Sequence, residues 1–200
     1  MTSETSEDVN AERRRFLTAA TSVVGVAGIV GVAVPFVGSW NPSAKAEAAG
    51  APVEADVSKL EPGAMVVVEW RGKPVYVVHR TERMLELLPS VDGKLKDPQS
   101  EISKQPAYIT GNERSLRPEL LVIEGLCTHL GCAPNFRPEV GAADLGGDDW
   151  IGGFFCPCHG SKFDIAGRVF GGVPAPTNLV VPPHMFEGDK LIIGVDPEAA

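Results

Sequence analysis

All four cysteines of the chain and two of its four histidines fall in two stretches of six residues. The stretches are Cys127-Thr128-His129-Leu130-Gly131-Cys132 and Cys156-Pro157-Cys158-His159-Gly160-Ser161. Each holds a cysteine and a histidine within three or four residues, one further cysteine, and a glycine that permits a sharp turn. Thiolate and imidazole groups on two such loops are typical of a metal site. The fold is therefore expected to bring these two loops to one place.

Zinc and an iron–sulfur centre are the two interpretations of this site. A tetrahedral zinc takes four ligands, so it would leave two cysteines over and would have to share the loops with a disulfide. An iron–sulfur centre accounts for all six side chains, with two thiolates on one iron, two imidazoles on the other, and two cysteines that bridge the loops. The spacing does not say which cysteine of each loop is the ligand. A zinc-stabilised binding domain stays open at this point.

The N-terminal part of the chain has the composition of a membrane anchor. Residues 16–37 carry no charge, and as a helix they would span about 33 Å, close to the roughly 30 Å of a bilayer's hydrocarbon core. The preceding Arg13-Arg14-Arg15-Phe16-Leu17 resembles the twin-arginine export signal; a plain arginine cluster that only sets orientation is the alternative. Either interpretation keeps residues 1–15 in the cytoplasm and sends the rest outward. The run is longer than the core of a cleaved signal peptide, so a retained anchor is expected despite the small residues around Lys45.

Two features next to this run bear on partners and mobility. Gly25, Gly28 and Gly31 recur every three residues and form a smooth strip, which permits the close approach of a second transmembrane helix. Residues 38–55 are rich in Ala, Pro and Gly and lack apolar periodicity, so they are predicted to be a flexible hinge linker. The chain is thus expected to be a single-pass membrane protein with its head at residues 56–200.

The charge balance argues against one class of partner. The chain has 18 basic and 26 acidic residues, a net charge of −8 at pH 7. Residues 1–45 are neutral, so the whole excess lies in residues 46–200. Such an acidic head is a poor match for a phosphate backbone, and no nucleic-acid partner is expected. Acidic residues at the extreme N-terminus also argue against a mitochondrial transit peptide and favour a bacterial protein.

The head is predicted to be all-β. A hairpin with a four-residue turn at 71–74 is expected, because β-rich runs flank that turn. Thr81 is a candidate cap for a short helix through Leu88, and residues 120–123 are expected to be a buried strand that leads into the first cysteine. Further strands are expected at 150–155, 168–170, 179–181 and 190–195. Together these elements indicate a small, loop-rich antiparallel β-sandwich.

The motifs C-T-H-L-G-C and C-P-C-H-G-S resemble those of the Rieske iron–sulfur family, specifically the subunit of quinol–cytochrome c oxidoreductases, the cytochrome bc complexes. The likeness covers the whole chain, including the anchor, the linker and the Gly-Val-Pro-Ala-Pro loop at 172–176. It implies the Rieske fold, with a cluster-binding subdomain in the head, and one [2Fe–2S] cluster. Rieske-type oxygenases and their ferredoxins lack the second cysteine pair, so that pair favours the quinol-oxidising branch.

The resemblance also implies a ligand set, formed by the first cysteine and the histidine of each motif. These are Cys127 and Cys156 on one iron, and His129 and His159 on the other. The second cysteine of each motif, Cys132 and Cys158, matches the disulfide of the family.

The family resemblance also implies roles for residues that are not ligands. Ser161 matches a serine whose hydroxyl donates to a cluster sulfide, and Leu130 is expected at the exposed tip, in contact with quinone or a membrane partner. The loop at 172–176 is expected to pack over the cluster and exclude water. His79 and His184 have no cysteine neighbour and are interpreted as structural histidines.

The implied activity is that of an electron-transfer subunit that oxidises membrane quinol. Imidazole ligands raise the potential of such a cluster to about −150 to +300 mV, against about −400 mV for all-cysteine clusters. His159, and with it His129, is expected to take up a proton on reduction, before the electron passes to a c-type cytochrome.

The implied partners are cytochrome b, a c-type cytochrome and membrane quinol, in a dimeric complex of several subunits. The chain would sit in a bacterial inner membrane, with its head in the periplasm. A membrane-tethered Rieske subunit of another exported oxidoreductase is the alternative.

Overall fold

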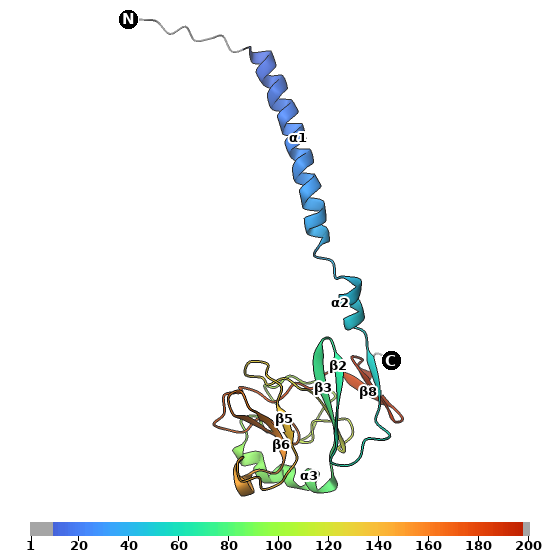
Figure 1. Ribbon diagram of the computed structural model, residues 1–200, viewed down its shortest axis with the longest axis vertical. Coiled ribbons are helices and arrows are strands. Elements are labelled where there is room, and N and C mark those ends of the chain that lie inside the picture. Colours follow the sequence, from blue (N-terminus) through green and yellow to red (C-terminus); the bar gives the residue numbers. More distant parts are fainter. Residues whose placement is uncertain (1–9, 198–200) are drawn as a thin grey trace, which may run out of the picture. The chain divides into compact units, whose positions relative to one another are not determined.

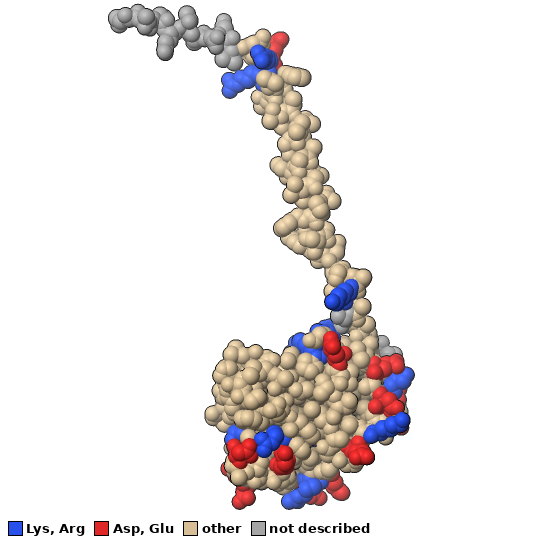
Figure 2. All heavy atoms as spheres, in the orientation of Figure 1, with Lys and Arg blue, Asp and Glu red and all other residues tan. Residues whose placement is uncertain are grey.

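The computed structural model describes residues 10–197 and divides the chain after Glu47 into two compact units. The first is built on one helix, α1 (Ala11–Gly38), which exceeds the expected 16–37 span at both ends (Figure 1). The Asn10 carboxamide caps it by accepting from two backbone N–H groups of the first turn. None of the described side chains of α1 is buried, and charges lie only at its N-terminal end (Figure 2). The helix is long and apolar enough to cross a membrane.

The predicted hinge linker, residues 38–55, is partly regular. A short helix, α2 (Ala44–Ala49), forms where alanines dominate the sequence. The first strand, β1 (Val53–Asp56), begins before the predicted end of the linker and pairs with the chain's last strand. The last residues of the predicted linker therefore take part in a sheet of the head.

Three antiparallel sheets, each of three strands, make up the head (Figure 1). The central sheet has the order β2–β3–β4 and consists of β2 (Met65–Trp70), β3 (Lys73–His79) and β4 (Leu120–Glu124). The second sheet, β1–β9–β8, adds β8 (His184–Glu187) and β9 (Lys190–Ile193). The third sheet, β5–β6–β7, consists of β5 (Asn135–Arg137), β6 (Gly153–Cys156) and β7 (Ser161–Asp164). The predicted all-β antiparallel class is confirmed.

The central sheet is covered on both faces, because its strands bury alternate side chains in two different cores. On β3, Val75 and Val77 pack with Leu191 and Ile193 of the second sheet. Tyr76 and Val78 point the other way, into the larger core that holds the third sheet and two of the cysteines. This explains why β4 is an unbroken apolar run, since both of its faces are buried.

Several predicted elements differ from the structure. The hairpin turn has two residues, Arg71 and Gly72, both with positive φ, so β3 begins at Lys73 and the predicted turn at 71–74 is wrong. Residues 168–170 contribute only isolated bridges, and residues 179–181 form no named strand. Their backbone groups bond instead to other loops, as where Leu179 N–H donates to Gly167.

Helices in the head are short. α3 (Glu82–Leu87) is capped by Thr81, whose hydroxyl accepts from Met84 N–H, and Thr81 is the predicted cap. Two 3₁₀ turns, η1 (Leu88–Lys94) and η2 (Gly147–Asp149), complete the regular structure of the described chain.

The buried imidazole of His184 makes the stability of the head sensitive to acid. Its Nδ1 lies 2.9 Å from the Pro182 carbonyl oxygen, and its Nε2 has no partner among the described residues. Burial lowers the pKa of His184. In the unfolded chain, histidine has a pKa near 6.5 and becomes protonated below that pH, whereas His184 in the folded head stays neutral to lower pH. The free energy of unfolding therefore falls as the pH drops below about 6.5.

We expect a smaller free energy of unfolding in urea at pH 5 than at pH 7, and a smaller pH difference in His184→Asn. The matched control is His79→Asn, because His79 is only half-buried and its Nδ1 contacts the Leu60 carbonyl. An equal pH difference in wild type and His184→Asn would contradict this explanation.

Candidate metal centre

The two cysteine–histidine loops lie at the ends of strands in the head. The second is the hairpin turn between β6 and β7, where Cys156 pairs with Ser161 and Gly160 N–H donates to the Cys156 carbonyl at 3.0 Å. The first follows β4 and closes on itself, because Cys127 N–H donates to the Cys132 carbonyl at 2.8 Å. Gly131 and Gly160 both have φ near +75°, which glycine adopts without strain.

The fold brings together the four side chains that the resemblance implies as ligands. The imidazole rings of His129 and His159 lie 4.8 Å apart, centroid to centroid, and are almost perpendicular. Cys127 and Cys156 are buried and both carry free thiols. His129 is half-buried and His159 is exposed, so the site reaches the surface on its histidine side. Leu130 is 72% exposed, as expected for a tip residue.

The sulfur of Cys127 sits among several hydrogen-bond donors. Burial raises the pKa of the Cys127 thiol, and its hydrogen bond with the Cys156 side chain raises it further. The backbone N–H of His129 and the Ser161 hydroxyl act in the opposite direction, because they donate to the Cys127 sulfur and favour the thiolate. Such donors stabilise a sulfur that carries negative charge, as a metal-bound thiolate does.

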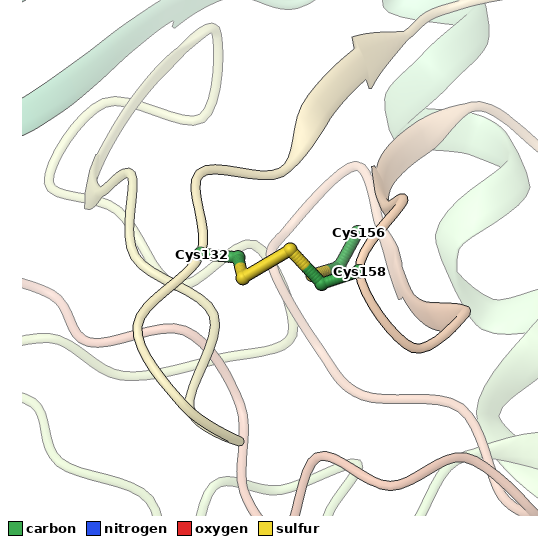
Figure 3. Close-up of side chains that lie close together, drawn as sticks. All are labelled: Cys132, Cys156 and Cys158. Atoms are coloured by element: carbon green, nitrogen blue, oxygen red, sulfur yellow. A yellow bond between two sulfur atoms is a disulfide. The ribbon is translucent and has the colours of Figure 1, made fainter.

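A disulfide joins Cys132 and Cys158 across the two loops (Figure 3). The sulfurs of Cys132, Cys156 and Cys158 all lie within 4.8 Å of one another. Because two of the three are bonded together, they do not form a thiolate site of their own. The disulfide instead holds the two loops next to each other, beside the buried Cys156.

The donor set fits a Rieske-type [2Fe–2S] cluster. Two free thiols and two imidazoles are available once the disulfide has taken the other two cysteines. The sulfurs lie on the buried side and the imidazoles on the exposed side. This arrangement suits a cluster with one iron held by sulfur and the other held by nitrogen.

Comparison with known proteins agrees with this donor set. The family described as "Rieske [2Fe-2S] domain" matches residues 51–183. The chain is 60% identical over 196 residues to the ubiquinol–cytochrome c reductase iron–sulfur subunit of Allochromatium vinosum, which covers 98% of this chain and 94% of that protein. The chain belongs to the Rieske iron–sulfur subunits of ubiquinol–cytochrome c reductase.

Other relatives extend the same result. The subunit of the same name from Blastochloris viridis is 44% identical, over 94% of this chain and 96% of that protein. The subunit from Bradyrhizobium diazoefficiens is 42% identical, over 97% of this chain and all of that protein. Residues 3–43 match the family described as "Ubiquitinol-cytochrome C reductase Fe-S subunit TAT signal". The predicted family, [2Fe–2S] cofactor and twin-arginine signal are confirmed, and the chain is an electron-transfer subunit of a cytochrome bc complex.

The loop at 172–176 packs against the metal centre of this Rieske subunit. Ala175 is fully buried, and its N–H donates to the Ser161 hydroxyl oxygen at 3.1 Å. Next to it, the Thr128 hydroxyl donates to the Thr177 carbonyl at 2.7 Å, which ties this segment to the first cysteine loop. Sequence reasoning placed this loop over the cluster, but it did not identify Thr128 as the residue that holds it.

Tyr76 supports the first cysteine loop from the central sheet. Its hydroxyl donates to the Pro134 carbonyl at 3.0 Å, and its ring stacks on Phe154 at 6.0 Å between centroids. Gly125 lies against this ring, where a Cβ atom would come within 2.3 Å of it. The supporting role of Tyr76 was not predicted from sequence. Tyr76 lies in a strand of mostly apolar residues, and nothing in that pattern indicates that its hydroxyl bonds to a residue 58 positions away.

A buried group of charges fixes the turn that follows β7. Arg114 and Arg80 donate to carbonyls of residues 165–167. Arg168 donates from Nε to the Asp164 carboxylate at 2.8 Å, with both side chains fully buried. Asp164 also accepts from two backbone N–H groups of the turn. Buried charges of this kind need such partners, so the turn is held in one conformation beneath the strand that begins with Ser161.

The two cysteine loops and the loop that packs over them carry no charged side chains of their own. Residues 125–136, 150–161 and 169–186 contain no Asp, Glu, Lys or Arg. In Figure 2, charged side chains gather along the lower and right-hand edges of the head, and its upper left side shows none. The loops that frame the site are therefore uncharged, with Leu130 exposed among them.

Proposed function

We propose that this subunit takes one electron from membrane quinol at its [2Fe–2S] cluster, with coupled release of a quinol proton, and passes that electron to a c-type cytochrome. The observation that carries the proposal is the arrangement of the donor set. Two buried thiols lie behind two adjacent imidazoles, and the outer imidazole, His159, is exposed among loops without charged side chains. Such uncharged loops admit an uncharged quinol headgroup to the imidazole without the desolvation of their own side-chain charges.

Each loop contributes one sulfur and one nitrogen in this proposal. The buried Cys127 and Cys156 would hold one iron, and His129 and His159 would hold the other. When bound, the cluster supplies a one-electron acceptor of high potential. The hydroxyl of Ser161 would donate to a cluster sulfide, and a donor there favours the reduced, more negative state.

His159 is the proton acceptor. The ring nitrogen of His159 that does not bind iron accepts a hydrogen bond from the quinol hydroxyl and takes its proton when the electron leaves the quinol. His129 lies 4.8 Å away, and its half-buried ring orients His159 from one side. Leu130, 72% exposed, contacts the quinol or the cytochrome b surface around it.

The anchor and linker place this chemistry at the membrane. α1 spans the inner membrane of a bacterium once, with residues 1–15 cytoplasmic and the head in the periplasm, because three arginines precede the apolar helix and the export signal moves the head outward. The strip at Gly25, Gly28 and Gly31 faces a helix of a partner subunit, such as cytochrome b in a dimeric complex. The linker lets the head move between quinol and cytochrome.

The test uses membranes from a strain that lacks this subunit, complemented with variants of the full chain. Wild type should restore cytochrome c reduction by added quinol, and His159→Ala should lose at least about 100-fold of that rate, since general base catalysis contributes about 10²–10⁴-fold. The matched control is His79→Ala, because His79 lies on β3, outside the two cysteine loops. If His159→Ala kept the cluster's EPR signal and oxidised quinol at the wild-type rate, the proposed role would be wrong.

A further inference from the structure

A second segment of the chain, residues 94–103, lies against the loop that packs over the metal centre. Lys94 accepts Gly171 N–H at its carbonyl oxygen, at 2.7 Å, and Lys96 N–H donates to the Val169 carbonyl at 3.0 Å. Asn178 closes the other end, because its side chain donates to the Asp97 carbonyl at 2.8 Å. The loop is therefore fastened at both ends by one short segment.

The side chain of Lys96 reaches further than these backbone contacts. Its Nζ lies 2.6 Å from the Val173 carbonyl oxygen and 2.7 Å from the Ala175 carbonyl oxygen. An ammonium group has three donors and no acceptor, so it satisfies two carbonyls of one bend without any other polar partner. Hydrogen bonds to a charged donor are also shorter and stronger than neutral ones. Lys96 thus fixes the middle of the loop, where no regular structure holds it.

Hydrogen bonds connect Lys96 through the loop to Ser161, which lies beside the proposed cluster ligand Cys156. Ala175, whose carbonyl Lys96 holds, donates its own N–H to the Ser161 hydroxyl oxygen. A hydroxyl has one donor and two acceptor positions, and this bond fills an acceptor position. The hydroxyl proton of Ser161, whose backbone pairs with Cys156 across the β6–β7 hairpin, is then left free for the metal centre. Ser161 and Ala175 are fully buried, so water does not compete for these bonds.

We propose that Lys96 is a positioning residue for the metal centre: its ammonium holds the 172–176 loop so that Ala175 N–H orients the Ser161 hydroxyl toward the proposed cluster. Lys96 itself does not touch the cluster, and it acts only through the loop. This rests on the proposed role of Ser161 as a hydrogen-bond donor to the cluster. The consequence is that an exposed lysine on a separate segment sets both the closure of the loop and the reduction potential of the centre.

The test compares variants of the full-length holoprotein purified in detergent. Lys96→Met keeps the length of the side chain but removes both hydrogen bonds. It should speed hydrogen exchange at Ala175 N–H by about ten-fold or more, which corresponds to about 1.4 kcal/mol, and lower the midpoint potential in a redox titration. Lys96→Arg, which keeps charge and donors, should restore both values toward wild type. Lys96→Gln keeps N–H donors but removes the charge, so its values should fall between those of Lys96→Met and wild type, which provides the same test if Lys96→Met does not fold.

Lys94→Met is the matched control, because it removes an equal charge two residues away. The Lys94 ammonium pairs with exposed Asp149 at 2.6 Å, and its carbonyl bond to Gly171 survives the substitution. It should change neither exchange at Ala175 nor the potential. The inference would be overturned if Ala175 N–H exchanged at the wild-type rate in Lys96→Met, or if Lys94→Met shifted the midpoint potential as much as Lys96→Met does. Neither result would bear on the proposed quinol oxidation. Loss of quinol oxidation in a His159 variant is a separate measurement and does not bear on the Lys96 contacts.

Discussion

Cys156→Ser should leave the protein without a detectable [2Fe–2S] cluster. Cys156 is buried at the end of β6, and its sulfur is one of only two free thiols among the described residues. A serine hydroxyl does not ionise at neutral pH and is a poor substitute for a soft thiolate ligand. Visible absorption and low-temperature EPR of the purified full-length protein measure the effect, and both cluster signals should be absent. Cys127→Ser should behave in the same way.

The matched control removes the other two cysteines. The double variant Cys132→Ser/Cys158→Ser keeps both free thiols and should still show the cluster spectrum when freshly purified. It should lose about 3.5 kcal/mol of stability, from the chain-entropy cost of a disulfide that joins residues 26 positions apart. A normal cluster spectrum in Cys156→Ser, or no cluster in the freshly purified double variant with its fold intact, would contradict the assignment of ligands and disulfide.

Gly153→Ala should destabilise the third sheet strongly, and more than alanine at any of the other glycines described above. Gly153 starts β6 with φ of 152°, and a Cβ there would lie 2.1 Å from the backbone oxygen of Phe163 and 2.7 Å from the backbone carbon of Asp164. The clash is with backbone of β7, so no side chain rotation relieves it. Overpacking and backbone strain together should cost about 3 kcal/mol or more. Because β6 and β7 carry Cys156 and Ser161, cluster content should fall with stability.

Thermal unfolding measures this effect, and Tm should fall by about 6–12 °C. Gly188→Ala is the control, since Gly188 also has positive φ but a Cβ there meets nothing within 4 Å. It should cost only the conformational penalty of about 1–2 kcal/mol for a left-handed residue. Equal Tm values for the two variants would show that the β6–β7 contact does not resist the added methyl group.

The location of the candidate site was predictable from sequence, because cysteine and histidine are rare residues and gather in two short turns whose glycines are visible in the chain. The choice of Cys127 and Cys156 as ligands came only from the family resemblance and stays a prediction. The central strand β4 was also predictable, since burial of both faces leaves a continuous apolar run.

The short elements were not predictable in the same way. β5, β7 and β8 have three or four residues each, too few for a periodic pattern to stand out. The two-residue turn at Arg71 and Gly72 lacks the Asn-Gly or Asp-Gly pair that marks such turns, and it is held by the register of β2 and β3. Lys96 and Tyr76 gave no signal, because their hydrogen-bond partners lie 58 to 79 residues away along the chain.

The chain from the anchor enters the head at β1, and this has a mechanical consequence. β1 belongs to the β1–β9–β8 sheet, which packs on one face of the central sheet, while the cysteine loops belong to the core on the opposite face. Any pull along the linker therefore enters the head through four residue pairs between β1 and β9. The central sheet separates that load from the strands that position Cys156 and Ser161. If the head moves on its linker as proposed, the two cysteine loops should therefore keep their spacing while it moves.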